Sequence, residues 1–306
     1  MFTYIKRISL FLLTNLAVLV LLGFVMSVVN YFYPNLLTAY GDFTSLLAFA
    51  AIFGFGGAII SLLLSRWQAK KMYGIILLDS ATLHQEDARL QLVYQTVERI
   101  AKSKNIDMPE VGYYESAEPN AFATGASRNS ALVAVSTGLL NTMENREIEG
   151  VVGHEMAHVL NGDMVTLTLI TGVMNTFVIV LSHIVSRIVA GFLSRSDSDE
   201  GGISQLSYFL VYNVLQVVFG LLASIVIMYF SRMREYRADL GGAEFTSKAS
   251  MIAGLKRLQQ LTKLQDRHVD NGKLTAFMIS EPDSFWSTHP SLDNRIKALE
   301  ENYQLP

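Results

Sequence analysis

The sequence predicts a mainly α-helical, membrane-embedded α+β protein with four transmembrane helices and a polar domain that contains a small β-sheet. Of the 306 residues, 51% are hydrophobic and only 17% are charged, whereas soluble domains carry about 25% charged residues. The excess of apolar residues is concentrated in four long uncharged runs. The polar segments between these runs combine helical spacing with short β-branched stretches, which predicts the α+β part.

Composition excludes several classes of function. The chain has no cysteine, so a disulfide framework, a thiolate metal site and a cysteine nucleophile are ruled out. Any metal must therefore be bound through His, Asp or Glu. The net charge is −3, and no cluster of Lys and Arg forms the basic surface that a nucleic-acid partner requires.

The first two uncharged runs predict an N-terminal transmembrane hairpin over residues 1–65. No charged side chain occurs from Ile8 to Gly41 or from Phe43 to Ser65. A span needs about 20 apolar residues, so we expect spans near Leu10–Tyr31 and Phe43–Ser65. The first run is too long for a signal peptide, lacks a small-residue cleavage site and is followed at once by a second span. Three glycines suit close helix packing in this hairpin: Gly54, Gly56 and Gly57.

The other two uncharged runs predict a second transmembrane hairpin. They cover Met164–Ser182 and Leu206–Phe230, and the linker 191–205 between them is acidic and rich in Ser and Gly. An alternative is a buried hairpin that enters the bilayer without crossing it, because His183 and Arg187 near the end of the third run shorten it.

Basic residues predict the orientation of the spans. They cluster in three places: Lys6 and Arg7; Arg66, Lys70 and Lys71; Arg232, Arg234 and Arg237. The positive-inside rule places all three clusters on the cytoplasmic side, together with both termini. The linker 191–205 then lies outside. Residues 66–163 and 231–306 share the cytoplasmic side and form one domain, separated in sequence by the second hairpin, 164–230.

Periodicity predicts the elements of the cytoplasmic domain. His84–Ser103 has apolar residues at helical spacing. Val111–Tyr114 and Ala131–Ser136 are short and rich in β-branched or aromatic residues, as strands are. Glu144–Leu160 has acidic residues in its first turns, which favours a helix, and Asn161-Gly162 ends it.

The helix at 144–160 contains the sequence His154-Glu155-Met156-Ala157-His158. Residues four apart lie on one face of a helix, so His154 and His158 can reach one Zn²⁺. Glu155 can then act as general base on the attacking water and later as the acid that protonates the leaving amine. Residue frequencies give roughly one chance occurrence in 200 chains of this length, so two unrelated surface histidines are a weak alternative.

A catalytic zinc needs a third protein ligand and one open position. Glu235 follows the fourth span and the two histidines precede the third, so antiparallel spans bring them together at the membrane surface. Asp239, one turn after Glu235, can accept the free N–H of a ligand histidine. Two acidic residues on a solvated helix face are the alternative. The other histidines are poorer ligands, because His183 lies toward the far end of a span, while His84 and His268 lie in polar helical stretches.

These motifs resemble the bacterial HtpX-type membrane proteases, which are relatives of the CaaX-processing zinc proteases. The resemblance rests on the histidine motif with Asn161-Gly162-Asp163 and on Glu235-x-x-x-Asp239. Further matching segments are 11–18, 53–57, 119–125, 133–140, Thr288-His289-Pro290 and Arg295-Ile296. It covers nearly the whole chain and is weakest at 191–205 and around 262–285.

The resemblance implies a zincin-like cytoplasmic metalloprotease domain in a multi-pass protein of the bacterial inner membrane. It implies one Zn²⁺ per chain on His154, His158 and Glu235, with Glu155 as the base. Heat-shock-associated quality control is implied as well, with misfolded or damaged membrane proteins and unfolded polypeptides as substrates. Four residues would form an edge strand or loop that binds substrate: Asn120, Ala121, Phe122 and Ala123.

Two further residues are candidates for stabilising the oxyanion of a tetrahedral intermediate, His289 and Arg295. A histidine in a loop before proline is often structural, so both roles stay open for His289. A true intramembrane protease is disfavoured, because polar residues flank the motif on both sides. A metal-binding membrane scaffold or chaperone-like protein is the alternative from another functional class. A structural zinc in such a protein would be closed by four protein ligands and would have no need for Glu155. The oligomeric state is open.

Overall fold

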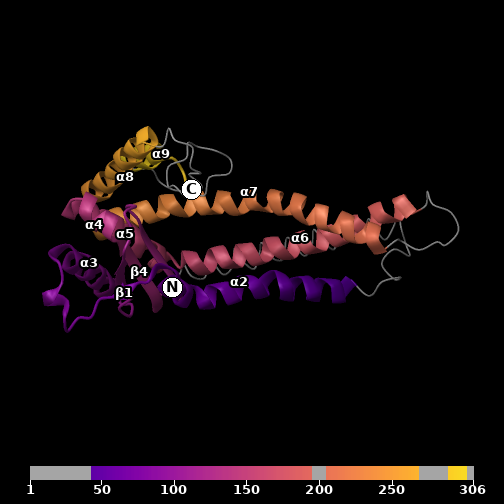
Figure 1. Cartoon of the computed structure of the whole chain (residues 1–306), viewed down its shortest axis with the longest axis horizontal. Coiled ribbons are helices and arrows are strands. Elements are labelled where there is room, and N and C mark those ends of the chain that lie inside the picture. Colours follow the sequence, from indigo (N-terminus) through magenta and orange to yellow (C-terminus); the bar gives the residue numbers. More distant parts are fainter. Residues whose placement is uncertain (1–42, 195–204, 269–288, 302–306) are drawn as a thin grey trace. The chain divides into compact units, whose positions relative to one another are not determined.

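The computed structural model describes residues 43–194, 205–268 and 289–301 (Figure 1). This part of the chain is mainly helical and contains one small mixed sheet. The predicted span near Leu10–Tyr31 and most of the linker 191–205 lie outside the described residues. The chain divides into two compact units, Met1–Ile60 with Thr168–Ile227 and Ser61–Leu167 with Met228–Pro306.

Three helices of the described chain are long and apolar enough to cross a membrane. They are α2 (Phe43–Tyr73), α6 (Asp163–Ser194) and α7 (Gln205–Phe245). Their candidate spans are Leu46–Tyr73, Asp163–Phe192 and Leu206–Phe245. In the most apolar 18-residue stretch of each, only 11%, 28% and 6% of the residues are buried. Outward-facing apolar side chains are what a lipid environment favours. Three of the four predicted uncharged runs therefore fall in such helices.

The unit that contains residues 168–227 is held together by close helix contacts. A Cβ at Gly54 of α2 would lie 2.4 Å from Thr176 Oγ1 of α6, so this glycine allows the two backbones to approach. No described residue comes within 4 Å of such an atom at Gly56 or Gly57. Between α6 and α7, the Tyr208 hydroxyl lies 2.6 Å from His183 Nδ1.

The sheet lies in the other unit and has the strand order β1-β2-β4-β3. Strands β2 (Glu110–Tyr114) and β4 (Ser130–Ser136) pair in parallel and confirm the two strands predicted from the sequence. The short β1 (Ile76–Leu77) pairs antiparallel with β2. On the other side, β3 (Ala121–Ser127) pairs antiparallel with β4 and forms an edge of the sheet.

Helix α5 (Asn145–Asn161) packs between the sheet and two further helices. Its first turn has a capping box made by Glu144 and Glu147, and Gly162 ends it with φ +67°, a left-handed conformation that glycine adopts without strain. Both ends agree with the prediction to within one residue. The core around it contains Ile148, Val152 and Met156, all fully buried.

Helix α3 (Ala88–Lys104) begins four residues later than the sequence predicts. Asp87 is the N-cap, and its side chain accepts a hydrogen bond from the backbone N–H of Arg89. His84 lies before this cap, in the short 3₁₀ helix η2 (Leu83–Gln85). The Asp87 cap satisfies a free backbone N–H of the first turn and so sets the start of the helix, which the spacing of apolar residues alone does not locate. The predicted apolar face of α3 is buried: Leu90, Val93, Val97 and Ile100.

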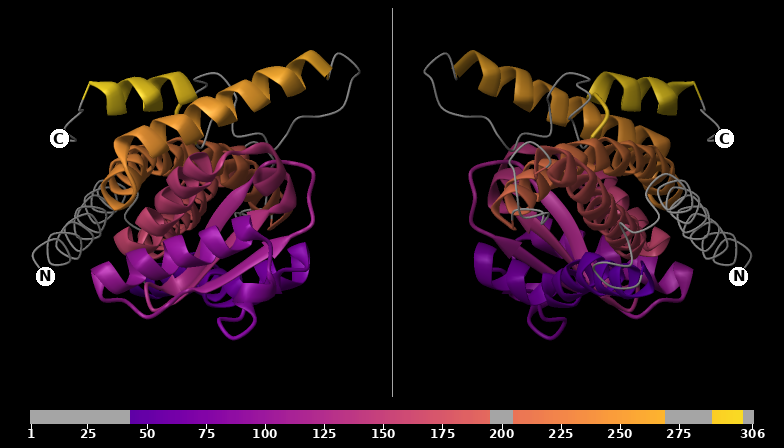
Figure 2. Two further views of the ribbon diagram at one scale, coloured as in Figure 1. Left: turned by 90° about the vertical axis from the view of Figure 1, so that its left-hand side faces the viewer. Right: turned by 90° about the vertical axis from the view of Figure 1, so that its right-hand side faces the viewer.

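Three further helices complete this unit, and one of them packs on α5. The short α4 (Thr137–Thr142) follows β4, and α8 (Lys248–His268) packs along α5. Helix α9 (Leu292–Glu300) lies on α8 (Figure 2). Its residues Leu292, Ile296 and Leu299 join Met251 and Leu255 in another apolar cluster.

Close packing of α5 on α8 makes Gly150 sensitive to substitution. A Cβ at this position would lie 2.3 Å from the carbonyl oxygen of Ser250. We expect Gly150→Ala to destabilise the protein by about 1–3 kcal/mol, since a rigid backbone must move. Thermal unfolding in detergent measures this. Gly220→Ala in α7, where no described atom lies within 4 Å, is the control and should not destabilise. Equal stability of both variants would contradict the packing described here.

Candidate metal centre

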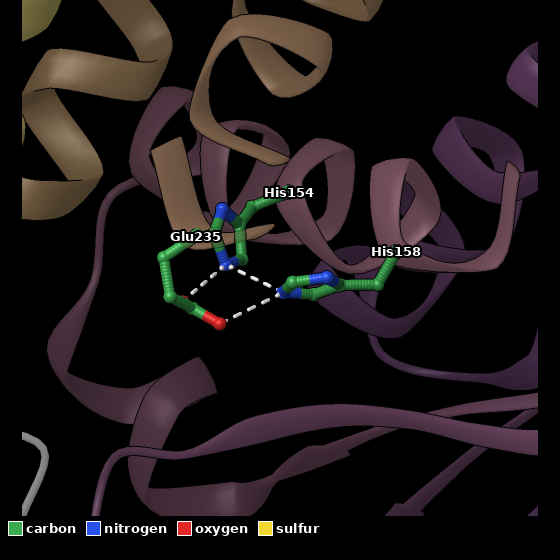
Figure 3. A group of neighbouring side chains, drawn as sticks. All are labelled: His154, His158 and Glu235. Carbon is green, nitrogen blue, oxygen red and sulfur yellow. Dashed lines mark hydrogen bonds and ion pairs between the residues drawn. The ribbon is translucent and has the colours of Figure 1, made fainter. Parts of the chain in front are cut away.

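Two histidines and one glutamate meet in the interior of the unit that carries the sheet. His154 and His158 lie one turn apart on α5, and their Nε2 atoms are 3.2 Å from each other. Glu235 comes from α7, with Oε2 3.3 Å from His154 Nε2 and Oε1 3.4 Å from His158 Nε2 (Figure 3). The three residues are 7%, 9% and 1% exposed. The structure therefore brings together all three residues that the sequence predicts as ligands.

A carboxylate holds the other nitrogen of each imidazole. His154 Nδ1 lies 2.9 Å from Asp239 Oδ1, and His158 Nδ1 lies 2.7 Å from Asp163 Oδ2. A carboxylate can only accept a hydrogen bond, so both Nδ1 atoms carry a proton. In the neutral rings the Nε2 lone pairs then point into the same small space. Such carboxylates also fix the orientation of the rings.

The spacing of these donor atoms fits a tetrahedral metal. Ligands at the zinc distance of about 2.0 Å are separated by about 3.3 Å along each edge of a tetrahedron. The three observed separations are 3.2, 3.3 and 3.4 Å. Two imidazoles and one carboxylate form a donor set of the catalytic kind, which leaves one coordination position for water or substrate.

The charges around the donors also favour a cation. Three buried carboxylates surround the imidazoles, on Asp163, Glu235 and Asp239, and the buried cation near them is Arg295. The Arg295 guanidinium donates to Asp239 over 2.6 and 2.8 Å and lies 3.5 Å from Glu235 Oε2. Buried charge is costly unless it is paired. Arg234, partly exposed, lies 3.8 Å from Glu235 Oε1. With neutral imidazoles, the three carboxylates outnumber these two arginines, and the remaining negative charge favours a metal cation.

The same carboxylates change the proton affinity of the imidazoles. Burial lowers the pKa of His154, but hydrogen bonds with Asp239 and Glu235 outweigh it and leave this pKa above its ordinary value. Burial likewise lowers the pKa of His158, while bonds with Asp163 and Glu235 raise it to about 10. A metal must therefore displace protons to bind, as it does at histidine sites generally.

Glu155 and the predicted substrate segment line one cavity with the histidines. The cavity has a volume of about 280 Å³, and its walls include Glu155, His154 and His158. Asn120 to Ala123, at the start of the edge strand β3, line it as well. The ring of Phe122 packs against those of Tyr73 and Tyr114, whose centroids lie 5.2 and 5.8 Å away.

His289 and Arg295 lie beside the glutamate. His289 Nδ1 is 3.0 Å from Glu235 Oε2, and the side chain of His289 is 34% exposed. Arg295 is 4% exposed and lines the same cavity. The ion pair between Arg295 and Asp239 joins α9 to α7 across 56 positions of sequence, a contact that spacing alone does not reveal.

Asp163 is a partner of His158 that the sequence motifs did not predict. It lies five residues after His158, and the left-handed Gly162 turns the chain so that α6 begins with the Asp163 side chain at the imidazole. A carboxylate that directly follows the glycine at the end of the helix with the two histidines indicates a contact of this kind with the second histidine. His84 and His183 lie elsewhere, beside Gln85 and Tyr208.

Known proteins share this arrangement of sequence and fold. The model of peptidase family M48 matches residues 85–303. Protease HtpX of Tolumonas auensis is 46% identical over 299 residues, covering 97% of this chain and 99% of its own. A protease HtpX homolog of Neisseria meningitidis is 49% identical over 297 residues, with 96% and 99% covered. Protease HtpX of Shewanella baltica is 47% identical over 297 residues, with the same coverage.

A solved structure has a similar fold. Ste24p from S. mikatae superposes with a TM-score of 0.59 at 17% identity, over 95% of this chain and 66% of that one. At this identity the likeness concerns the fold alone. The family match covers most of the chain, and the curated relatives match it nearly from end to end. The chain therefore belongs to peptidase family M48 and is a membrane-bound metallopeptidase.

Proposed function

We propose that the protein is a zinc-dependent endopeptidase whose metal is held by His154, His158 and Glu235. The observation that carries this proposal is the convergence of two Nε2 atoms and one carboxylate at separations of 3.2 to 3.4 Å. Asp239 and Asp163 would fix the two imidazole rings from behind. A zinc ion at this position would lower the pKa of a bound water to about 7 and polarise the scissile carbonyl.

Glu155 is the proposed general base. It follows His154 on the helix face that borders the cavity and is partly exposed there. Its carboxylate would take a proton from the attacking water. It would then deliver this proton to the nitrogen of the leaving amine, so that one group serves both steps. A positioned base or acid contributes about 10²- to 10⁴-fold to the rate of such a step.

His289 and Arg295 are proposed to stabilise negative charge that develops on the scissile carbonyl oxygen. Both line the cavity. Arg295 also holds Asp239 through its paired hydrogen bonds. Burial lowers the pKa of the Arg295 guanidinium, but the charge of Asp239 outweighs burial and raises this pKa above its ordinary value. His289 lies beside Glu235. From there its imidazole can donate a hydrogen bond to an oxygen at the open side of the site.

The edge strand β3 is proposed to bind the substrate backbone. An edge strand offers unpaired N–H and C=O groups, so an extended peptide can add to it as another strand. Asn120, Ala121, Phe122 and Ala123 lie at the end of β3 that borders the cavity. This mode requires an unfolded segment, which fits misfolded or damaged membrane proteins and unfolded polypeptides as substrates.

We further propose four spans in the bacterial inner membrane, with the catalytic domain and both termini in the cytoplasm. The support is the distribution of basic residues and the three long apolar helices of the described chain. The proposed boundaries are 1–65 and 164–230 for the two hairpins, and 66–163 with 231–306 for the protease domain. The proposed cellular role of the protein is protein quality control under stress.

Replacing Glu155 separates catalysis from metal binding. We expect Glu155→Gln to retain zinc and to lose at least about 10²-fold in kcat, because the proton acceptor is gone while the ligands remain. Cleavage of an unfolded polypeptide by detergent-purified protein, with and without chelator, measures activity. Elemental analysis measures zinc. Cleavage by Glu155→Gln at the wild-type rate would refute the base. Tight zinc without cleavage by either protein would favour a scaffold.

Asp163 is expected to strengthen metal binding through His158. Asp163→Ala should weaken zinc affinity about 10- to 100-fold, because the imidazole loses the hydrogen bond that orients it and raises its basicity. Competition with a zinc indicator measures the dissociation constant. Asp107→Asn, at an exposed position of the same unit, is the control and should bind as wild type does. An unchanged affinity of Asp163→Ala would show that the 2.7 Å contact has no such role.

The absence of cysteine from the natural sequence makes a topology test simple. We expect Ser198→Cys, in the linker 191–205, to react with a membrane-impermeant maleimide added to spheroplasts. Ser103→Cys, in α3, should react only after the membrane is opened. Labelling of both positions only after opening would show that the second hairpin enters the bilayer without crossing it.

A further inference from the structure

The side chain of Tyr114 ends in a buried hydroxyl that makes no hydrogen bond with any described residue. Tyr114 is the last residue of β2 and is 3% exposed. A buried tyrosine hydroxyl usually has a partner, because a polar group that leaves water without replacing its hydrogen bonds costs free energy. Tyr114 does not itself line the cavity, so direct contact with a substrate does not explain this hydroxyl.

Two neighbouring rings fix the position of the Tyr114 side chain. Its ring centroid lies 5.1 Å from that of Tyr73 and 5.8 Å from that of Phe122. Aromatic rings attract one another at such separations. Phe122 belongs to β3 and lines the cavity. A ring packed in this way cannot carry its hydroxyl to a distant group, so a hydrogen-bond partner must come to the hydroxyl.

The side chain of Asn120 is the neighbour that can supply this partner. Burial raises the pKa of Tyr114 to about 12, and after burial the amide of Asn120 has the largest effect and lowers this pKa. The amide is therefore close to the hydroxyl. An amide offers both donors and an acceptor, so a rotation of the Asn120 side chain is enough to pair the two groups. Asn120 also lines the cavity.

The backbone of Asn120 is held by β4, which leaves the side chain as its means of contact with a substrate. Its N–H donates to Ser136 Oγ over 2.9 Å, and its C=O accepts from the Ser136 N–H over 2.8 Å. The side to which a residue directs its N–H and C=O alternates along a strand. Both groups of Asn120 face β4, so Ala121 is the first residue of β3 whose groups face the open edge. A substrate backbone at that edge lies beside the Asn120 amide.

We propose that Tyr114 is a positioning residue whose hydroxyl pairs with the side-chain amide of Asn120 when substrate is bound, and so holds this amide against the substrate backbone. The inference rests on the proposed endopeptidase function and on substrate binding at β3. It assigns part of the free energy of substrate binding to a hydrogen bond that forms only with substrate present. A group that acts on binding and not on the chemical step changes KM and leaves kcat unchanged.

Tyr114→Phe tests this role, because it removes the hydroxyl and keeps the ring. The assay uses full-length, zinc-loaded protein in detergent with an unfolded polypeptide as substrate. We expect KM to rise about 3- to 10-fold, the effect of one neutral hydrogen bond, with kcat within about 2-fold of wild type. On the Glu155→Gln background, fluorescence anisotropy of a labelled, uncleaved polypeptide should show the same fall in affinity.

The stability of Tyr114→Phe separates this role from a merely structural one. Its unfolding temperature should equal or exceed that of wild type, because a buried hydroxyl without a partner is gone. A lower unfolding temperature with an unchanged KM would show a structural hydroxyl and overturn the inference. Tyr113→Phe is the matched control, because Tyr113 precedes Tyr114 in β2, points to the other face of the sheet and packs against the core. It should keep the wild-type KM and kcat.

A double substitution tests whether Tyr114 acts through Asn120. Asn120→Ala should raise KM, and Tyr114→Phe added to it should raise KM no further, because the partner of the hydroxyl is already gone. Effects on KM that multiply would overturn the inference. A fall in kcat without a change in KM would overturn it too, since the hydroxyl would then act on the chemical step.

These results leave the proposed function standing, because wild type still cleaves the polypeptide. If wild type cleaves no polypeptide although it holds zinc, the proposed function fails and the inference falls with it.

Discussion

The site depends on two imidazole rings whose positions are fixed from outside the metal cavity. Asp239 and Asp163 hold the Nδ1 atoms at 2.9 and 2.7 Å, which leaves both Nε2 lone pairs directed at Glu235. Two such nitrogens 3.2 Å apart carry no proton when both rings are neutral, and one bound cation then satisfies both lone pairs. The close helix packing, the buried charges and the cavity around the site all serve this arrangement.

The fold supplies these groups from the ends of long helices. Glu235 and Asp239 lie near the C-terminal end of α7, and Asp163 is the first residue of α6, while α5 provides both histidines. Arg295 from α9 neutralises part of the charge on the two carboxylates of α7. Four helices thus meet at one centre. The edge strand β3 borders the same cavity, so the proposed binding of the substrate backbone and its hydrolysis would act on adjacent atoms.

Local patterns predicted much of this from the sequence. The helix at 144–160, its glycine stop and the strands β2 and β4 depend on periodicity and caps, which are local. Glu235 was found because antiparallel spans bring distant segments together. Asp163 was missed as a partner of His158, because the contact depends on the left-handed turn at Gly162. The pairing of Arg295 with Asp239 depends on the tertiary packing of α9 on α8, which no local pattern encodes.

X-ray absorption at the zinc edge of the purified, detergent-solubilised protein tests the central claim most directly. The account predicts one zinc per chain, bound by nitrogen and oxygen at about 2.0–2.1 Å, with the outer-shell scattering of two imidazoles. His158→Ala should remove one imidazole from this signal and release most of the metal. A spectrum without imidazole, or an unchanged spectrum and zinc content in His158→Ala, would contradict the assignment of the metal to this centre.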